Sequence, residues 1–287
     1  MHNKKAEGLM NAVGSITYNM TNDYMFRYIL QKNKKVLIGL ICSLLHLQPS
    51  QIKTIEIKNP INLAGSVSGK DFVLDIHIEL NNNTYINLEM QVVNKHNWPD
   101  RSLSYLCRRY DQLYQGQEYE EALPVYHIGF LDYTLFPDTP EFYATYKMQN
   151  VKNHYTYSDK FVLSVVDLSS IELATEEDEA CGLVYWARLF KAKTWEELKM
   201  LAKENEYLQE AAESIYIANA DDIVRQQCRA REEAERYERT MKRDMQILKE
   251  ENEQLKEDNG QLRADISELK SNMAILMQKL QERDKKD

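Results

Sequence analysis

The sequence has 287 residues, 43% of them hydrophobic, so the chain can bury one sizeable core and still have material outside it. The formal net charge of −9 excludes an overall basic protein, yet residues 1–125 carry 13 Lys and Arg against 12 Asp and Glu, which permits phosphate contact by this part. The four cysteines lack C-x-x-C spacing and the longest apolar run, residues 36–47, is too short to cross a bilayer, which predicts a soluble, cytoplasmic protein with no membrane partner, zinc ribbon or disulfide framework.

The N-terminal elements expected from the sequence are a tail, two helices and a strand. Residues 1–15 are expected to form a flexible tail. Thr21 or Asn22 can cap the first helix, whose apolar residues share one face. The second helix is apolar enough to be buried. Apolar and polar residues alternate along the strand after it. These elements are expected at residues 23–32, 34–46 and 52–60.

The segment DFVLDIHIELNNNTYINLEMQVV, residues 71–93, predicts a β-hairpin, because two runs of alternating apolar residues flank three asparagines. A three-residue loop of asparagines, which tolerate the left-handed conformation, sets Leu80 opposite Thr84. Counting back from that pair gives an apolar face of Ile78–Ile86, Ile76–Leu88 and Leu74–Met90, and a polar face of His77–Asn87, Asp75–Glu89 and Val73–Gln91.

The opposed carboxylates of Asp75 and Glu89 would repel each other, so something should compensate their charge. A hard divalent cation such as Mg²⁺, or Mn²⁺ as a substitute, takes carboxylate oxygen ligands and would do so. The alternative is a polar strand face that simply points to solvent. A register slip of one residue would also separate the two acids.

A helix and two strands are expected after the hairpin. Pro99 and Asp100 favour a helix start, and Gly116 favours its end. Strands are expected at residues 123–135 and 160–168, and the first is apolar enough to be buried on both faces. The apolar residues that recur at helical spacing in the helix are Leu103, Leu106, Tyr110 and Leu113. Strands interspersed with helices predict an α/β core.

The spacing of Asp75 from the triplet Glu89-Met90-Gln91 resembles the signature of PD-(D/E)XK nucleases, and in particular the transposase-like, recombination-promoting branch in which E-x-Q replaces E-x-K. The ordered segments TNDYMFRYIL, GKDFVLDI, RSLSYLCRRYDQLYQGQEY and LPVYHIGFLDY extend the resemblance over about residues 20–170. It implies a restriction-endonuclease-like mixed sheet flanked by helices. It also implies Mg²⁺-dependent cleavage of DNA, with catalytic Asp75, Glu89 and Gln91 and metal on the two acids.

Gln91 stands where the wider superfamily has a lysine. A lysine there would position the attacking water and stabilise charge developing on phosphorus. Glutamine can orient a water molecule but brings no positive charge, so more of the electrostatic stabilisation falls to the metal. The resemblance favours an active variant, and an inactive site is the alternative.

Other polar residues of this region are candidates with ordinary alternatives. Asp23 is a candidate third metal ligand, or it only complements a helix dipole. His77 lies on the site face, where a surface or hydrogen-bonded role is the more common one. The candidate nucleic-acid-binding residues are Lys70, Arg101, Arg108 and Arg109. Arginine suits phosphate, so the arginines can hold a DNA backbone, or they form a solvated helix edge and Lys70 is simply exposed.

The C-terminal part predicts a helical linker at residues 171–222 and a coiled coil at residues 223–284. Heptad d positions are Met241, Leu248, Leu255, Leu262, Leu269 and Leu276, and a positions are Met245, Asn252, Asn259, Ile266, Met273 and Leu280. Buried asparagine pairs favour two parallel strands. Acidic g positions (Asp244, Glu251, Asp258, Asp265) precede basic e positions (Lys249, Lys256, Arg263, Lys270) by five residues, which also favours a parallel homodimer. The alternative is a single exposed helix or a charged tail.

Together these features predict a nuclease domain at residues 16–170, the helical linker and a dimerising segment. The function expected is Mg²⁺-dependent DNA cleavage by a homodimer. The alternative is an inactive nuclease fold that serves as a scaffold for coiled-coil interactions.

Overall fold

The computed structural model describes residues 8–60, 75–111, 113 and 116–283. The chain divides into two compact units, Met1–Glu232 and Glu233–Asp287. The first unit holds the sheet and the shorter helices, and the second consists of the continuation of the last helix, α9 (Asp222–Arg283).

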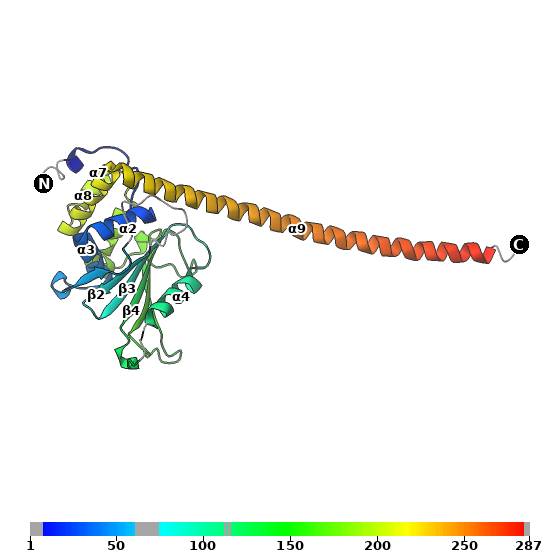
Figure 1. Cartoon of the computed structure of the whole chain (residues 1–287), viewed down its shortest axis with the longest axis horizontal. Helices are drawn as coiled ribbons and strands as arrows, with labels where there is room; N and C mark the ends of the chain where they lie inside the picture. The colour runs from blue at the N-terminus through cyan, green and yellow to red at the C-terminus, as the bar shows by residue number, and fades with distance from the viewer. Residues whose placement is uncertain (1–7, 61–74, 112, 114–115, 284–287) are drawn as a thin grey trace. The chain divides into compact units, whose positions relative to one another are not determined.

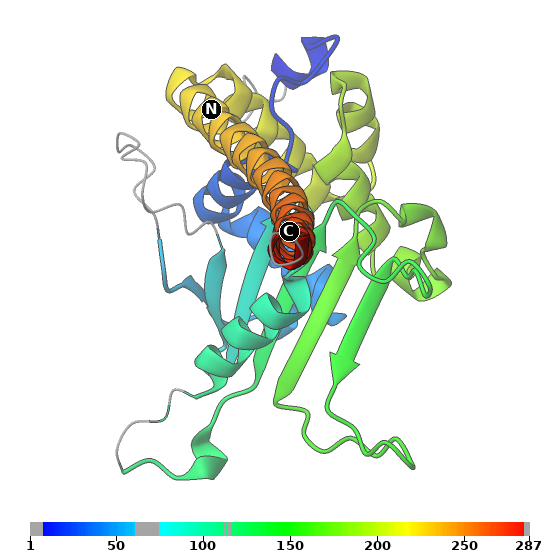
Figure 2. The same cartoon turned by 90° about the vertical axis from the view of Figure 1, so that its right-hand side faces the viewer.

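Within the described residues, six strands form one mixed sheet (Figure 2). The strands are β1 (Ile55–Ile57), β2 (Ile76–Leu80), β3 (Thr84–Gln91), β4 (Val125–Leu131), β5 (Tyr143–Lys147) and β6 (Phe161–Asp167). Their order is β1-β2-β3-β4-β6-β5, in which β3, β4 and β6 run parallel and the other neighbours pair antiparallel. The expected α/β fold with a mixed, restriction-endonuclease-like sheet is confirmed.

The register of the β2–β3 hairpin is the one that the asparagine loop predicts. Leu80 pairs with Thr84, and the ladder continues back to the pair of Ile76 and Leu88. Asn81 and Asn82 adopt the left-handed conformation, with φ of 54° and 55°. Leu74 and Val73 lie outside the described residues.

A helical layer covers the apolar face of the sheet (Figure 1). It contains α2 (Asp23–Lys32), α3 (Lys34–Leu45), α6 (Leu183–Lys191) and α8 (Glu206–Ala220). Phe26 of α2 packs at 5.4 Å from Phe130 of β4 and 5.6 Å from Phe190 of α6, measured between ring centroids. Shorter elements are η1 (Pro49–Gln51), η2 (Tyr119–Glu121), η3 (Ile171–Leu173), α5 (Glu176–Ala180) and α7 (Trp195–Leu201).

The opposite face of the sheet is covered by α4 (Trp98–Tyr110), which lies in front of the strands in Figure 2. Trp98 packs with Leu131 of β4 and Val165 of β6 in a second, small apolar cluster. Strand β4 is therefore buried on both faces, as the sequence indicates. The polar face of the hairpin lies on this side of the sheet.

Two elements differ from the expectation. Helix α4 ends at Tyr110 rather than at Gly116, and its buried residues are Trp98, Ser102 and Leu106, whereas Leu103 is 47% exposed. The large indole of Trp98 sets this orientation, because it packs directly against the backbone of Gly129. Strand β5 was not predicted at all; it is a five-residue edge strand with a mixed polar and apolar sequence.

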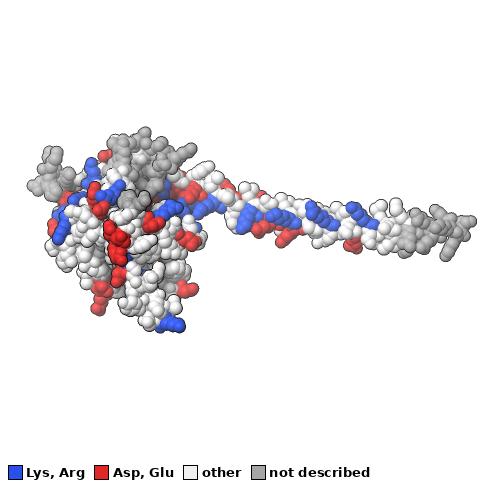
Figure 3. Space-filling view, turned by 60° about the horizontal axis from the view of Figure 1, so that its bottom comes forward, with Lys and Arg blue, Asp and Glu red and all other residues white. Residues whose placement is uncertain are grey.

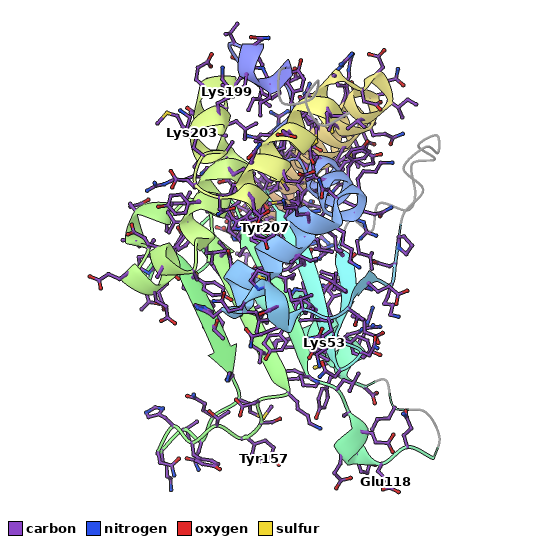
Figure 4. All side chains as sticks on the ribbon, turned by 90° about the vertical axis from the view of Figure 1, so that its left-hand side faces the viewer. Lys53, Glu118, Tyr157, Lys199, Lys203 and Tyr207 are labelled. Atoms are coloured by element: carbon purple, nitrogen blue, oxygen red, sulfur yellow. The ribbon has the colours of Figure 1, made fainter. Side chains whose placement is uncertain are left out.

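The N-terminal residues are also more ordered than predicted. Residues 8–11 form a helical turn, and Lys199 donates hydrogen bonds to the carbonyls of Met10 (3.3 Å) and Ala12 (2.8 Å) (Figure 4). The amide of Trp195 donates to Gly14 O at 3.0 Å. The expectation of a flexible tail up to Ser15 is therefore wrong for residues 8–15.

The region predicted as a linker is part of the packed unit. Helices α6 and α8 contribute to the same apolar core as α2 and α3, and Tyr207 of α8 lies against Gly39 of α3 (Figure 4). Residues 171–232 thus complete the first unit, because the apolar face of the sheet needs their cover.

Helix α9 runs for 62 residues, and its heptad positions from Met241 to Leu276 are exposed in the single chain, with Leu248 and Leu269 both 63% accessible. Figure 3 shows Lys and Arg side chains recurring along the second unit, with Asp and Glu among them. A coiled coil remains a prediction for this helix. None of the helices in the described part of the chain has the length and apolarity that a membrane span requires.

Candidate active site

Asp75 lies immediately before β2, on the sheet face covered by α4, and is buried. Nε2 of His77, two residues later on the same face, lies 2.6 Å from Asp75 Oδ2. Burial alone would raise the pKa of Asp75, but the hydrogen bond and charge of His77, with a smaller effect from Arg27, hold it below its usual range. His77 therefore has a hydrogen-bonded role, and Asp75 is ionised at neutral pH.

The backbone of Asp75 is held by two further residues. The buried guanidinium of Arg27 in α2 donates to the carbonyls of both Asp75 and Asn59. The Asn59 side chain donates to Asp75 O at 3.0 Å and accepts from the His77 amide at 2.8 Å. The helical layer thereby fixes the position from which the Asp75 carboxylate extends.

Glu89 lies near the C-terminal end of β3 and is also buried. Nε and Nη2 of Arg101 both lie 2.8 Å from Glu89 Oε1. The other oxygen, Oε2, has no hydrogen-bond partner among the described residues. Burial raises the pKa of Glu89, and the negative charge of Asp75 adds to this, against the opposing charge of Arg101. The two acids are therefore close enough to interact.

Gln91 follows Glu89 on the same face of β3. Its Nε2 donates to Val93 O at 3.2 Å, whereas its buried Oε1 has no hydrogen-bond partner in the described part of the chain. A buried amide oxygen without a donor is costly in a folded protein unless water or an ion satisfies it.

His127 of β4 belongs to the site and was not singled out from the sequence. Its Nδ1 accepts a hydrogen bond from the Asn87 amide at 2.9 Å, which leaves the proton on Nε2, 3.9 Å from Glu89 Oε2. Burial lowers the pKa of His127 to about 4, so the ring is neutral at neutral pH. The parallel pairing of Asn87 with His127 brings it here, and the sequence alone does not reveal which strand neighbours β3.

Tyr133, just beyond β4, also faces this region. Its buried hydroxyl makes no hydrogen bond to the described residues. Burial and the charge of Glu89 raise the pKa of Tyr133 to about 12, so the phenol stays protonated. It is a further donor that the sequence reading missed.

The unsatisfied oxygens fit a divalent metal. Glu89 Oε2, Gln91 Oε1 and the Asp75 carboxylate are hard oxygen donors of the kind that Mg²⁺ and Mn²⁺ prefer. No cluster of three or more His, Cys, Asp or Glu suited to a metal exists among the described residues. An ion at this place would therefore have two carboxylates, and its remaining ligands would be an amide, water or phosphate oxygens.

Asp23 is not part of this group. Its Oδ2 lies 2.5 Å from Nε of Arg231 in α9, so an arginine compensates its charge, whereas its buried Oδ1 has no hydrogen-bond partner among the described residues. Burial raises the pKa of Asp23 although Arg231 opposes this. The described residues contain no group of three acids placed to hold a metal, which contradicts the expectation of Asp23 as a third ligand beside Asp75 and Glu89.

The candidate phosphate-binding residues are distributed unevenly. Lys70 lies outside the described residues. Arg101 lies in the site, where it forms an ion pair with Glu89. Arg108 is exposed on α4, and the guanidinium of Arg109 lies 3.9 Å from the centre of the Tyr85 ring. Arg101 thus contacts Glu89, a candidate catalytic residue.

Searches among curated proteins and among solved structures found no match to this chain. The model of one protein family, described as PD-(D/E)XK nuclease family transposase, matches residues 20–245. The matched range includes Asp75, Glu89 and Gln91 and covers most of the chain. The fold, the paired acids and this match show that the chain belongs to the PD-(D/E)XK nuclease family transposases.

Proposed function

We propose that this protein is a metal-dependent DNA endonuclease in which Asp75 and Glu89 hold Mg²⁺ and Gln91 orients the attacking water. The family supports nuclease chemistry in general, and its members typically use divalent metals. The observation that carries the proposal is the pair of buried oxygens without partners, Glu89 Oε2 and Gln91 Oε1, beside a second carboxylate.

The residues of the site have different roles in the proposed reaction. Asp75 stays ionised through His77 and is held by Arg27 and Asn59, so it presents a fixed negative charge. Glu89 keeps one oxygen open while Arg101 occupies the other. Gln91 Oε1 can accept a hydrogen bond from a water molecule. When bound, Mg²⁺ would supply positive charge to the phosphate and lower the pKa of a bound water.

The direct test replaces Asp75 with asparagine, which keeps the shape of the side chain and removes its charge. We expect nicking of supercoiled plasmid in Mg²⁺ or Mn²⁺ to fall by at least about 100-fold. Asp138→Asn, the same change at an exposed position, should cut normally. Undiminished cutting by Asp75→Asn would remove the assignment.

We further propose that residues 241–280 form a parallel two-stranded coiled coil, so that the enzyme acts as a homodimer. The exposed leucines at the d positions and the opposite charges at g and e support this arrangement. Two active sites in one dimer could each cut one strand and thereby make double-strand breaks. The recombination-related role implied by the branch with E-x-Q is part of the same proposal.

A non-catalytic scaffold is the second candidate, and one observation favours it. Arg101 already compensates Glu89, and Gln91 brings no catalytic cation, so this site can exist without a metal. Calorimetric titration of Mg²⁺ and Mn²⁺ into the purified protein separates the two functions. Heat of binding that disappears in Asp75→Asn supports the nuclease, and absence of binding supports the scaffold.

A further inference from the structure

The proposed reaction needs a positive charge near the phosphate that the E-x-Q triplet does not supply. Hydrolysis of a phosphodiester develops negative charge on the non-bridging oxygens of the phosphate, and fixed positive charge in a water-poor site stabilises it. Gln91 supplies none. The nearest cations to Glu89 in the described structure are Arg101, in direct contact, and Lys95, whose charge acts on Glu89 from further away.

Arg101 has the geometry of a group held ready for a second anion. Both of its contacts to Glu89, from Nε and Nη2, go to the same oxygen, Oε1. Its third nitrogen, Nη1, takes no part in these contacts to Glu89. The Arg101 side chain is 36% accessible whereas that of Glu89 is 8% accessible, so the guanidinium lies between the buried acid and solvent.

Two aromatic rings support the position of the Arg101 guanidinium. Its central carbon lies 5.2 Å from the centre of the Tyr105 ring, and that ring stacks at 6.1 Å and 18° on His127. The guanidinium is therefore held by both the Glu89 carboxylate and the Tyr105 ring. A planar fork of N–H donors matches two phosphate oxygens, and an ammonium group does not.

We propose that Arg101 is the catalytic cation of this E-x-Q site, with its guanidinium contacting the scissile phosphate in place of the missing lysine. This inference rests on the proposed endonuclease function. In the reaction, the water oxygen forms a bond to phosphorus and the P–O bond to the leaving sugar oxygen breaks. One water proton passes to solvent and the leaving oxygen takes up a proton, so no redox partner is needed.

Two lesser roles give different results and can be separated. If Arg101 only held Glu89 in place, its loss would weaken metal binding. If it only bound the DNA backbone, its loss would raise KM and leave kcat unchanged. A catalytic cation lowers kcat and leaves metal binding intact, because removing a competitor for Glu89 does not weaken the ligands of the ion.

The experiment compares the full chain with Arg101→Gln, and with Arg188→Gln as an exposed control of the same chemical change. Three quantities are measured: the single-turnover cleavage rate of a DNA duplex at saturating protein in Mn²⁺, the affinity for that duplex in Ca²⁺, and Mn²⁺ affinity by calorimetry. We expect the cleavage rate of Arg101→Gln to fall by about 100-fold or more, with both affinities retained.

A second variant tests whether the lost positive charge is the cause of the lost rate. Adding Gln91→Lys to Arg101→Gln returns a positive charge to the site from the neighbouring strand, and we expect about a tenfold recovery of the cleavage rate. A fall in Mn²⁺ affinity that accounts for the lost rate, or no recovery with Gln91→Lys, would overturn the catalytic role. If the unaltered chain cuts DNA and Arg101→Gln cuts equally well, only this inference fails. If the unaltered chain does not cut, the proposed function fails and this inference with it.

Discussion

At the scale of single residues, the site keeps a histidine neutral in a buried polar cluster. His127 is fully buried, and its pKa is lowered from 6.5 to about 4. The unfolded chain binds a proton at this histidine near pH 6.5, and the folded chain does so only near pH 4. Between these values the unfolded state holds more protons, so the free energy of unfolding falls as the pH is lowered from 6.5 to 4.

We therefore expect His127 to cost the folded protein roughly 3 kcal/mol of stability on acidification across this range. His127→Asn keeps an acceptor for Asn87 and should make the free energy of unfolding less dependent on pH between 6.5 and 4. Urea unfolding at several pH values measures the difference. His154→Asn, at an exposed position, should leave the dependence unchanged. If the free energy of unfolding depended on pH equally in His127→Asn and in the unaltered chain, the assignment of a buried neutral ring would be wrong.

Residues with local signals were the ones that sequence reasoning could find. Asp75, Glu89 and Gln91 follow from alternation along two strands and from the triplet that resembles a known nuclease. His127 could not be found in this way, because its place depends on the parallel pairing of β4 with β3. The partner of Asp23 is 208 positions away in the sequence, so its pairing with Arg231 leaves no local trace.

At the scale of elements, the fit of α4 onto the sheet depends on one glycine. A Cβ placed on Gly129 of β4 would overlap the indole ring of Trp98. We expect Gly129→Ala to destabilise the protein by about 1–3 kcal/mol, because the ring must leave its position in a packed cluster. Thermal or urea unfolding measures this loss.

A double-mutant cycle identifies the cause. Trp98→Leu removes the clashing ring atoms, so Gly129→Ala should cost much less in that background. Ala187→Gly, which alters a buried position of α6 away from this contact, should show no coupling to Trp98→Leu. Equal costs of Gly129→Ala in both backgrounds would mean that the ring is not what excludes the methyl group.

The elements that the sequence predicted best are those whose own periodicity is strong. Helices α2 and α3 and the hairpin register follow from apolar spacing and from asparagine loop chemistry. Strand β5 was missed because an edge strand buries little and shows no clean alternation. The face of α4 was misjudged because the match between Trp98 and Gly129 is a tertiary one.

At the scale of the whole molecule, the proposed parallel coil makes a prediction about charge. Lys249→Glu with Lys256→Glu places acids opposite the acidic g positions, and Asp244→Lys with Glu251→Lys places bases opposite bases. Each double variant alone should dimerise weakly, and an equimolar mixture should restore the dimer. Sedimentation velocity at micromolar concentration measures both. Unimpaired self-association of either variant would contradict the parallel register.

The beginning of α9 belongs to the sheet-bearing unit, whatever the rest of that helix does. Cys228 is fully buried, its carbonyl accepts a hydrogen bond from the Asn22 side chain, and Arg231 neutralises the buried Asp23. Anyone trimming the gene to obtain a shorter protein for crystallisation should therefore place the stop codon after Glu232. Ending the chain near residue 222, where the composition changes, would leave the buried Asp23 without its counterion and expose part of the hydrophobic interior to water.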